Sequence, residues 1–192
     1  MLFSFITNKF GGYYSMRQRF EKTNSVFSKR LYTFINRKFQ EETNSYLPYD
    51  NTIKGPINFL HGTYGIFISG SAVIGNNCTI FQQVTIGSNM LIDSKGFGSP
   101  TIGDNCLIGA GAKIIGNITI GNNCRIGANA VVTHDVADNS VVVLGKPIIL
   151  HKEDLNNNTY QYSDQGWGYV KDGIFVLETD QEKLKKLTQL HS

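Results

Sequence analysis

The sequence has no long hydrophobic run and few histidines. No apolar stretch approaches the roughly 18 residues that a membrane-spanning helix needs, so we expect no spanning helix. The apolar start at residues 1–9 is too short for a convincing signal peptide, which leaves the cytosol as the expected location. Four scattered histidines in 192 residues argue against a centre in which three histidines hold one metal ion. We therefore predict no metal site.

A repeat of six residues fills the stretch 102–136. A branched aliphatic residue recurs at every sixth position, and a small or apolar residue stands four places after each. The first set is Ile102, Ile108, Ile114, Ile120, Ile126 and Val132, and the second set is Cys106, Ala112, Ile118, Cys124, Ala130 and Val136. Neither a helical period nor simple alternation produces this spacing. The pattern predicts a parallel β-helix in which three sixes close one triangular coil, with Gly, Asn and Asp in the turns.

The repeat is interrupted once. Clean sixes also begin at Ile68, Ile74, Ile80 and Ile86. The last of these would place Met90 inward at its fifth position. The next clean six begins 16 residues after Ile86, and 16 is not a multiple of six, so we predict a protruding loop over about 88–100. Loops on a rigid scaffold often carry function.

The three cysteines all occupy the fifth position of a six. Cys106 and Cys124 are 18 residues apart, which is one full coil, so they should stack at about 4.8 Å, one strand spacing. If the loop inserts ten residues, Cys78 joins the same column. With no histidine on that column, we interpret the cysteines as small, buried, reduced core residues.

We expect three parts in the chain: a helical segment over 1–52, the β-helix over 53–150, and a hairpin with a helix over 151–192. Apolar spacing predicts one helix over 13–42, with a stripe through Phe27, Leu31, Ile35 and Phe39. Near the other end, Asp172-Gly173 predicts the turn of a hairpin over 169–177. Residues 179–182 form a predicted capping box that begins a helix reaching residue 190.

Charge is distributed unevenly. Residues 1–40 hold eight basic residues and one acidic residue, a net of +7, whereas the remainder holds ten basic and fourteen acidic residues, a net of −4. This asymmetry predicts contact with a neighbouring subunit, a membrane surface or an anionic polysaccharide, and no nucleic-acid partner is expected. The apolar stripe in the same segment predicts packing on a partner or on the end of the β-helix, with a peripheral membrane surface as the alternative.

Several segments carry a resemblance to a known family. They are His61–Ile68, Val73–Cys78, Ile80–Gly87, Pro100–Asp104, Ile108–Gly116 and the stretch 141–147. Over residues 57 to about 150 the chain resembles the hexapeptide-repeat acyltransferases, in particular the serine O-acetyltransferases and the capsule and lipopolysaccharide O-acetyltransferases. The resemblance implies a left-handed β-helix, which departs from the usual crossover hand. It also implies a homotrimer or a dimer of trimers, and acetyl-coenzyme A as co-substrate.

The resemblance implies that His61 is the catalytic general base, because it alone matches the family's histidine before a Gly-Ile-x-Ile segment. It would take the proton of an acceptor hydroxyl directly, with no covalent enzyme intermediate. Serine acetyltransferases carry an acid immediately before this histidine, where the present chain has Leu60. A base needs a group that orients its other nitrogen, so a backbone carbonyl or Asp93 is expected to serve.

The resemblance also implies a coenzyme A groove along the coil edges. The matching positions are Gly87, Ser88, Ala110 and Ala128, with Arg125 and Lys146 near the phosphates. Small residues allow the pantetheine arm to approach the backbone, and a cation suits a phosphate. For Ala110 and Ala128 the alternative is that they are ordinary turn residues of the coil.

Three departures from serine acetyltransferases favour a sugar hydroxyl as acceptor: Leu60, Ser99 in place of the family's second histidine, and a shorter helical segment. Candidate acceptor-binding residues are Tyr64, Asp93, Phe97 and Trp167, with core or interface packing as the alternative for the aromatic ones. We therefore predict an O-acetyltransferase of polysaccharide biosynthesis that acts on a capsule, lipopolysaccharide or other surface saccharide, in the cytosol or at the inner membrane face. The alternatives are a serine O-acetyltransferase, an amino-sugar N-acetyltransferase and a non-catalytic trimeric scaffold. A metal-dependent hydratase is disfavoured by the scattered histidines.

Overall fold

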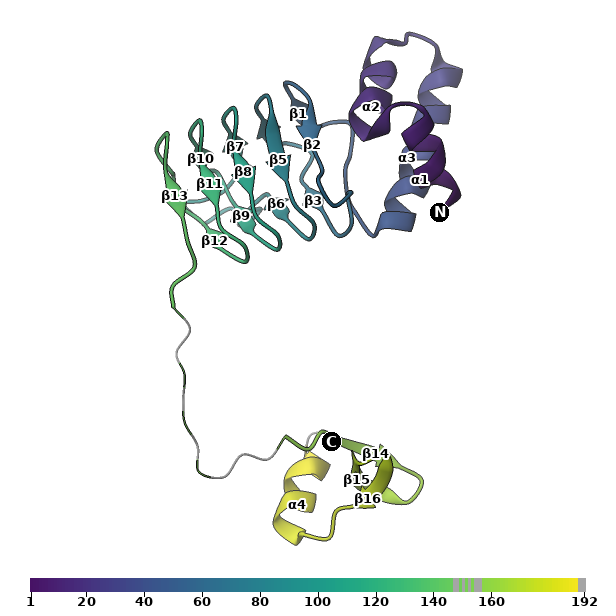
Figure 1. Cartoon of the computed structure of the whole chain (residues 1–192), viewed down its shortest axis with the longest axis vertical. Helices are drawn as coiled ribbons and strands as arrows, with labels where there is room; N and C mark the ends of the chain where they lie inside the picture. Colours follow the sequence, from purple (N-terminus) through teal and green to yellow (C-terminus); the bar gives the residue numbers. More distant parts are fainter. Residues whose placement is uncertain (147–148, 150, 152, 154–156, 190–192) are drawn as a thin grey trace. The chain divides into compact units, whose positions relative to one another are not determined.

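The computed structural model describes residues 1–146, 149, 151, 153 and 157–189. The chain forms two compact units, Met1–Lys146 and Pro147–Ser192. The first unit holds three helices and the β-helix, and the second holds a small sheet and a helix (Figure 1). In the part of the chain that is described, no helix is both long and apolar enough to cross a membrane.

Three helices, rather than the single predicted one, form the start of the chain: α1 (Leu2–Lys9), α2 (Gly12–Lys22) and α3 (Val26–Thr43). The prediction of one helix over 13–42 was wrong at residues 23–25. There Thr23 is extended, and the Ser25 side chain caps α3 by accepting a hydrogen bond from the Ser28 N–H at 3.3 Å. A serine that caps its neighbours competes with helix continuation, which the apolar spacing alone did not reveal.

The β-helix consists of three parallel sheets that the chain visits in turn. Its strands are β1 (Thr52–Ile53), β2 (Ile57–Asn58), β3 (Phe67–Ile68), β4 (Val73–Ile74), β5 (Cys78–Ile80), β6 (Thr85–Gly87), β7 (Thr101–Ile102), β8 (Leu107–Ile108), β9 (Lys113–Ile115), β10 (Thr119–Ile120), β11 (Arg125–Ile126), β12 (Val131–Val132) and β13 (Val141–Val142). The sheet orders are β1-β4-β7-β10, β2-β5-β8-β11-β13 and β3-β6-β9-β12. Each strand therefore pairs with the strand one coil later, as a triangular coil requires.

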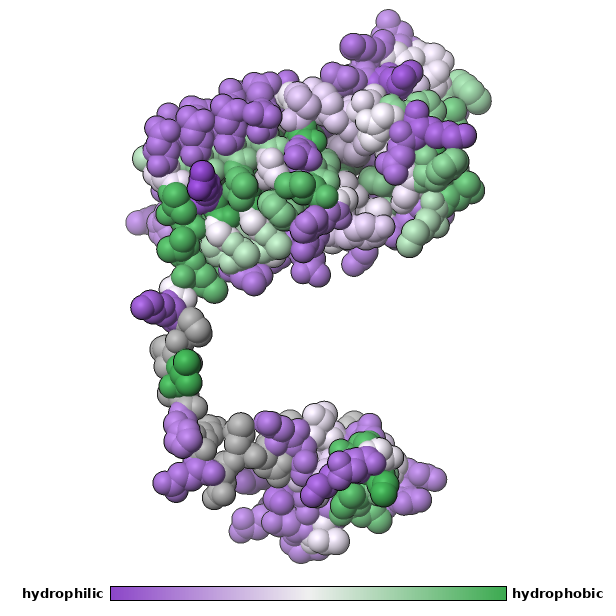
Figure 2. Space-filling model, viewed as in Figure 1, coloured by the Kyte–Doolittle hydropathy of each residue, from purple (hydrophilic) through white to green (hydrophobic). Residues whose placement is uncertain are grey.

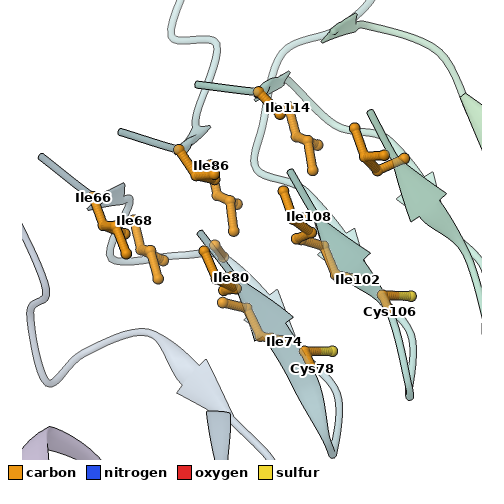
Figure 3. Packing of buried hydrophobic residues seen from close by; sticks show 14 of the residues in the cluster. Ile66, Ile68, Ile74, Cys78, Ile80, Ile86, Ile102, Cys106, Ile108 and Ile114 are labelled. Carbon is orange, nitrogen blue, oxygen red and sulfur yellow. The ribbon is translucent and has the colours of Figure 1, made fainter. Parts of the chain in front are cut away.

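The isoleucines of the repeat fill the interior. Ile74 pairs with Ile102, and Ile80 with Ile108, and each of these side chains is at most 1 % exposed. Figure 3 shows these side chains stacked coil upon coil inside the ribbon. A branched aliphatic side chain suits this position because it packs well on a pleated strand. The predicted β-helix, with a helical segment before it and a hairpin and helix after it, is confirmed.

The interruption of the repeat lies at residues 88–100, as predicted. The segment leaves the coil after β6 and returns at β7, and its ends are joined by reciprocal backbone hydrogen bonds between Asn89 and Gly98. Met90 is 72 % exposed, so its predicted inward position was wrong. The coil ends before the fifth place of that six, and the side chain points out with the loop.

Cys78 joins the column of Cys106 and Cys124, because the loop inserts ten residues. All three thiols are free and buried. The Sγ of Cys78 lies 3.2 Å from the Gly103 carbonyl oxygen, and the Sγ of Cys106 lies 3.1 Å from that of Gly121. Each thiol thus reaches the backbone of the next coil, and the interpretation of the cysteines as core residues is confirmed.

The turns of the coil form three edges, which we name by their contents. The ladder edge comprises 75–77, 103–105, 121–123 and 137–139. The histidine edge comprises 59–66, 81–84, 109–112 and 127–130. The loop edge comprises 69–72, 88–100, 116–118 and 133–135. The edges differ in how many of their polar groups hydrogen-bond to a neighbouring turn, and this difference locates the candidate site.

The second unit is a three-stranded antiparallel sheet with one helix. Its elements are β14 (Tyr160–Ser163), β15 (Gly166–Lys171), β16 (Ile174–Leu177) and α4 (Gln181–Gln189). The Asp172-Gly173 hairpin is confirmed, but β14 was missed because residues 155–168 lack an alternating apolar pattern. The helix is capped by Asp180, whose carboxylate accepts from the Glu182 N–H at 2.9 Å, and not by Thr179 as predicted. Its predicted end at residue 190 lies outside the described residues.

Candidate functional site

His61 lies on the histidine edge, in the turn between β2 and β3. This turn is longer than the equivalent turn of the next coil: Ile57 pairs with Cys78 and Phe67 pairs with Thr85, so the turn holds three additional residues. Gly62 and Gly65 both have positive φ, at 74° and 65°, which a residue with a side chain adopts only at a cost. The two glycines let the chain bulge outward there and leave the His61 side chain exposed.

Gln82, one coil further along the same edge, holds the His61 ring. The Nδ1 atom of His61 lies 2.8 Å from Oε1 of Gln82. The Phe81 ring packs against the imidazole in a T-shaped contact, with ring centroids 5.2 Å apart and ring planes at 88°. The orienting group is therefore Gln82, and the expectation that a backbone carbonyl or Asp93 fills this role was wrong.

This contact determines which ring nitrogen is available. An amide oxygen can only accept a hydrogen bond, so Nδ1 carries the hydrogen and donates it. The neutral ring then has an unprotonated Nε2, which makes no hydrogen bond within the described residues. An imidazole held in this tautomer can accept a proton at Nε2, as a general base must.

A cavity of about 380 Å³ opens beside His61, between the N-terminal helices and the first coil. Its lining residues are Ser4, Asn8, Gly12, Tyr13, Phe39, Thr43, Phe59, His61, Gly62, Thr63 and Tyr64. Aromatic rings form much of the wall, and hydroxyl and amide groups supply the polar contacts. Among the described residues, no Asp, Glu, Lys or Arg side chain lines it.

Two hydroxyl side chains of this cavity, Thr63 and Tyr13, differ in their hydrogen bonding. Thr63 is 5 % exposed, and its Oγ1 is buried without a hydrogen-bond partner among the described residues. Tyr13 donates its hydroxyl to the carbonyl oxygens of Leu47 and Pro48, and burial raises the pKa of Tyr13 to about 12. Tyr13 is thus a neutral wall of the cavity at physiological pH.

Glu42 of α3 holds the first residues of helix α1 beside this cavity. The Glu42 carboxylate accepts from the backbone N–H groups of Phe3 and Ser4, at 3.0 and 2.9 Å, and from the Ser4 hydroxyl at 2.9 Å. The hydrogen bond from the Phe3 N–H, followed by those from Ser4, lowers the pKa of Glu42 to about 2. Ser4 lines the cavity, so the Glu42 carboxylate hydrogen-bonds directly to one residue of its wall.

Ala110 and Ala128, two of the predicted cofactor positions, share the histidine edge with His61. Backbone hydrogen bonds stack its turns: Gln83 N–H to the Tyr64 carbonyl at 2.9 Å, Gly111 N–H to Gln82 at 3.0 Å, and Asn129 N–H to Ala110 at 2.8 Å. Three strand spacings separate the His61 turn from the Ala128 turn, or about 14 Å along the edge. The small side chains leave the backbone of this edge open to an extended ligand.

Gly87 and Ser88 lie elsewhere, at the loop edge. The Ser88 hydroxyl lies 2.6 Å from that of Ser99, so the loop is tied back on itself at this point. Gly87 is buried against the Ile115 side chain, which a Cβ would meet at 3.0 Å. Within one copy of the chain these two residues and His61 belong to different edges and are not brought together.

The remaining predicted residues are also dispersed. Arg125 points outward from the sheet of β11, between Leu107 and Val141 of the adjoining strands, and Lys146 is exposed beyond β13. Asp93 and Phe97 are exposed on the loop edge. Trp167 belongs to the second unit, where its ring meets Tyr162 at 5.4 Å. Of the predicted acceptor-binding residues, Tyr64 alone lines the cavity beside His61.

Sequence reasoning missed Gln82 and Thr63. Gln82 stands 21 residues after His61, which is one coil of 18 plus the three residues added by the long first turn. Counting that insertion would have placed Gln82 beneath His61. Thr63 carries no sequence signal, because only the arrangement of the helices around it shows that its hydroxyl is buried without a partner.

The structure offers no candidate for metal chemistry in its described part: no cluster of three His, Cys, Asp or Glu side chains could hold an ion there. His134 lies on the loop edge with its Nδ1 3.1 Å from the Thr133 hydroxyl, and His151 is exposed. His191 lies outside the described residues. The site is therefore centred on His61.

Comparison with known sequences finds one family and several relatives. The family described as bacterial transferase hexapeptide (six repeats) matches residues 99–134. The serine acetyltransferase of Bacillus pumilus is 37 % identical over 131 residues, covering 66 % of this chain and 58 % of that protein. The serine acetyltransferase of Bacillus subtilis is 47 % identical over 85 residues, covering 44 % and 38 %. The chain thus spans well under two thirds of the length of these relatives.

Comparison with solved structures agrees. A serine acetyltransferase of Entamoeba histolytica in complex with cysteine superposes with a TM-score of 0.56 and 33 % identity, over 72 % of this chain and 48 % of that one. The serine acetyltransferase of Neisseria gonorrhoeae in complex with serine gives a TM-score of 0.56 and 31 % identity, over 69 % and 54 %. The repeat of residues 99–134 thus matches the bacterial transferase hexapeptide family, and the three parallel sheets form the left-handed β-helix that these serine acetyltransferase structures share.

Proposed function

We propose that this chain is an O-acetyltransferase that moves an acetyl group from acetyl-coenzyme A to a hydroxyl of a small acceptor. One observation carries the proposal: Gln82 holds the His61 ring with Nδ1 as donor and leaves Nε2 unprotonated beside a cavity. The kinship with serine acetyltransferases supports the same reaction class.

His61 would act as a general base without covalent attachment to the enzyme. Acetyl-coenzyme A would supply an acyl thioester, whose carbonyl carbon receives the acceptor oxygen and whose sulfur leaves. Nε2 of His61 accepts the hydroxyl proton as the C–O bond forms, and it returns that proton to the sulfur as the C–S bond breaks. Gln82 keeps the ring in place throughout, because Nδ1 remains a donor to Oε1 in both charge states of the ring.

The histidine edge is the proposed track for the cofactor arm. Ala110 and Ala128 continue in line from His61 and present small side chains, which an extended pantetheine could follow. Gly87, Ser88, Arg125 and Lys146 lie off this track, so they can contribute only if another copy of the chain places them against it. A homotrimer, in which each edge faces a neighbouring protomer, is therefore part of the proposal, and a dimer of trimers stays a prediction.

L-serine is the first acceptor to test. The relatives named above are serine acetyltransferases, and one solved neighbour is described in complex with serine. These likenesses favour serine over the polysaccharide acceptor expected from the sequence.

A saccharide hydroxyl is the second candidate, and the cavity itself favours it. A serine zwitterion carries a carboxylate and an ammonium, and burying either charge without a partner is costly. The cavity beside His61 has aromatic walls, hydroxyls and an amide, and within the described part of the chain no Asp, Glu, Lys or Arg side chain lines it. Such a lining suits a neutral ring with several hydroxyls, and Tyr64 is placed to contact it.

The test is a turnover assay that follows coenzyme A thiol release with a panel of acceptors. We expect acceptor-dependent release that depends on His61. Release with L-serine would select the first acceptor, and release only with sugars or oligosaccharides would select the second. An amine acceptor would indicate the amino-sugar N-acetyltransferase alternative. Absence of release with every acceptor, from a chain that binds acetyl-coenzyme A as a trimer, would overturn the proposal in favour of a non-catalytic scaffold. A cytosolic location stays a prediction.

A further inference from the structure

The outer face of the N-terminal helices is apolar and basic, and nothing in the first unit covers it. The predicted stripe of α3 divides in two: Ile35 and Phe39 are 6 % exposed and pack inward, whereas Phe27 and Leu31 are 77 % and 45 % exposed. The inner half thus fulfils the expected packing on the β-helix end. The outer half has no partner within the described residues of this unit.

Residues of α1 extend this outer face. Phe3 of α1 meets Phe34 of α3 edge to face at 5.9 Å, and Phe10 meets Tyr32 at 6.1 Å, so the two helices lie side by side. We call the exposed apolar set the helical face, which comprises Leu2, Phe5, Val26, Phe27, Leu31 and Phe34. Figure 2 shows apolar side chains gathered over these helices, with hydrophilic side chains beside them.

Most of the Lys and Arg side chains on the helices that form the helical face have no carboxylate partner. The three carboxylates of residues 1–43 are each engaged: Glu21 with Arg17, Glu41 with Arg37 and Lys38, and Glu42 with the start of α1. Of the eight Lys and Arg side chains in residues 1–43, five have no carboxylate partner among the described residues: Lys9, Arg19, Lys22, Lys29 and Arg30. Lys9 lies 4.8 Å over the Phe5 ring and Lys29 5.8 Å over the Phe20 ring, so apolar and cationic groups alternate closely.

A groove within this surface combines both kinds of group. Its volume is about 480 Å³, and it is lined by Phe20, Val26, Lys29, Arg30, Thr33, Phe34 and Arg37, with no acidic side chain. Exposed aromatic and aliphatic residues with a rim of Lys and Arg are what an interfacial helix presents to anionic lipid.

We infer that the helical face is a docking surface for an anionic phospholipid bilayer. Phe5, Phe27 and Leu31 enter the boundary between headgroups and acyl chains, and Lys29 and Arg30 bind lipid phosphates. Charge complementarity selects this occupant over a two-fold contact in which the helical faces of two copies meet. A two-fold contact would place the same unpaired cations against each other, whereas an anionic leaflet neutralises them. The inference stands independently of the proposed acetyl transfer.

The experiment is co-sedimentation of the full chain with vesicles. One set consists of phosphatidylcholine alone, and the other contains about 30 % phosphatidylglycerol, a headgroup with one net negative charge. We expect binding to the anionic vesicles to be at least about tenfold tighter than to the neutral ones. Raising the salt from about 0.1 M to about 1 M should abolish most of this difference, because the Debye length falls to about 3 Å.

Two pairs of substitutions separate the two contributions. Lys29→Glu with Arg30→Glu should remove the preference for anionic vesicles, and Phe5→Ser with Phe27→Ser should weaken binding to them at least about tenfold. Control variants change exposed residues outside the helical face: Lys54→Glu with Lys171→Glu for the charge reversal, and Phe97→Ser with Ile174→Ser for the apolar change. Thermal melting of each variant, which we expect to match the wild type, reports folding separately from binding.

Three results would overturn the inference. The first is a wild-type chain that binds neither kind of vesicle. The second is equal binding to both kinds, with no effect of the Lys29 and Arg30 reversal beyond that of its control. The third is a smaller assembly of the Phe5→Ser, Phe27→Ser variant in sedimentation velocity with unchanged vesicle binding, which would assign the helical face to a contact between copies.

Discussion

The ladder edge and the histidine edge are built from the same repeat, but they differ in how their polar groups are hydrogen-bonded. On the ladder edge, a backbone N–H of each turn donates to a side-chain oxygen of the next turn. The Asn76 N–H donates to Oδ1 of Asp104 at 2.7 Å, the Asp104 N–H to Oδ1 of Asn122 at 2.8 Å, and the Asn122 N–H to Oδ1 of Asp138 at 2.8 Å. On the histidine edge, Nε2 of His61 and Oγ1 of Thr63 have no partner among the described residues.

The difference arises from the regularity of the turns. The ladder edge repeats one conformation, with Asn77, Asn105 and Asn123 all near φ of +55°, so identical side chains lie one above another and bond in a column. Asparagine tolerates this left-handed conformation better than most residues. The first turn of the histidine edge is longer and glycine-containing, so its side chains have no equivalent below them. The regular turns hydrogen-bond to one another and stabilise the β-helix, whereas the irregular turn leaves the His61 side chain free to bind a ligand.

The largest expected effect is loss of activity at the histidine edge without loss of stability. His61→Ala should lower kcat/KM by roughly 10²- to 10⁴-fold, because the acceptor hydroxyl loses its general base. The thermal midpoint should stay at the wild-type value, since the side chain is exposed. Measurement of thiol release with the same change at His151 as a control tests both statements. A His61→Ala enzyme with wild-type turnover would remove the site from this edge.

A smaller effect is expected where the edge orients the base. Gln82→Leu removes the acceptor of Nδ1–H, so both tautomers become accessible, and we expect about a tenfold fall in kcat with little change in KM. Gln82→Glu should move the acidic limb of the pH–rate profile to higher pH, because a carboxylate favours the charged imidazolium. An unchanged profile in Gln82→Glu would mean that the contact supports only the fold.

The ladder edge should show the converse pattern. Asp104→Ala removes the acceptor of the Asn76 N–H and should reduce the free energy of unfolding by about 1 kcal/mol, the usual net value of a hydrogen bond. The turnover of the folded variant should equal that of the wild type. Denaturant titration and the thiol assay, run on one preparation, distinguish this result from a catalytic role of the ladder.

The smallest effect concerns Glu42, which holds α1 against the cavity. Because the folded-state pKa of Glu42 is lowered to about 2, its contribution to stability is complete above the ordinary carboxyl value and declines as pH falls from there towards 2. Glu42→Gln should melt below the wild type at pH 7, and the gap should narrow as the pH is lowered through that window. A gap that is constant from pH 7 to about 3 would show that the carboxylate charge does not hold α1.

Much of the β-helix could be predicted because its information is local. The spacing of Ile102 to Val132 identified the inward positions, and the 16-residue interval after Ile86 located the loop and, through its ten extra residues, the register of Cys78. Each of these inferences depends on counting along the chain, and a coil that repeats its own geometry preserves such counts.

Predictions failed where a contact between distant residues decided the outcome. Met90 left its expected inward place because the loop ends, Asn89 and Gly98, pair with each other. Strand β14 depends on pairing with β15 rather than on its own pattern. Gln82 was missed for the same reason: its role exists only in the presence of the His61 turn. The division of α2 from α3 is an exception, because it depends on a local serine cap that the apolar spacing does not show.

The sequence by itself determined the period and the fold class, because a six-residue pattern of branched aliphatic residues admits few other packings. It also identified His61, the histidine that stands before the segment Gly65–Ile68. The tertiary structure alone decided which atom of His61 is available, since that depends on an amide one coil away. It also decided that the N-terminal helices enclose an uncharged cavity beside the histidine and turn a basic, apolar face outward. Both properties come from the packing of whole helices on the first coil, which no local pattern encodes.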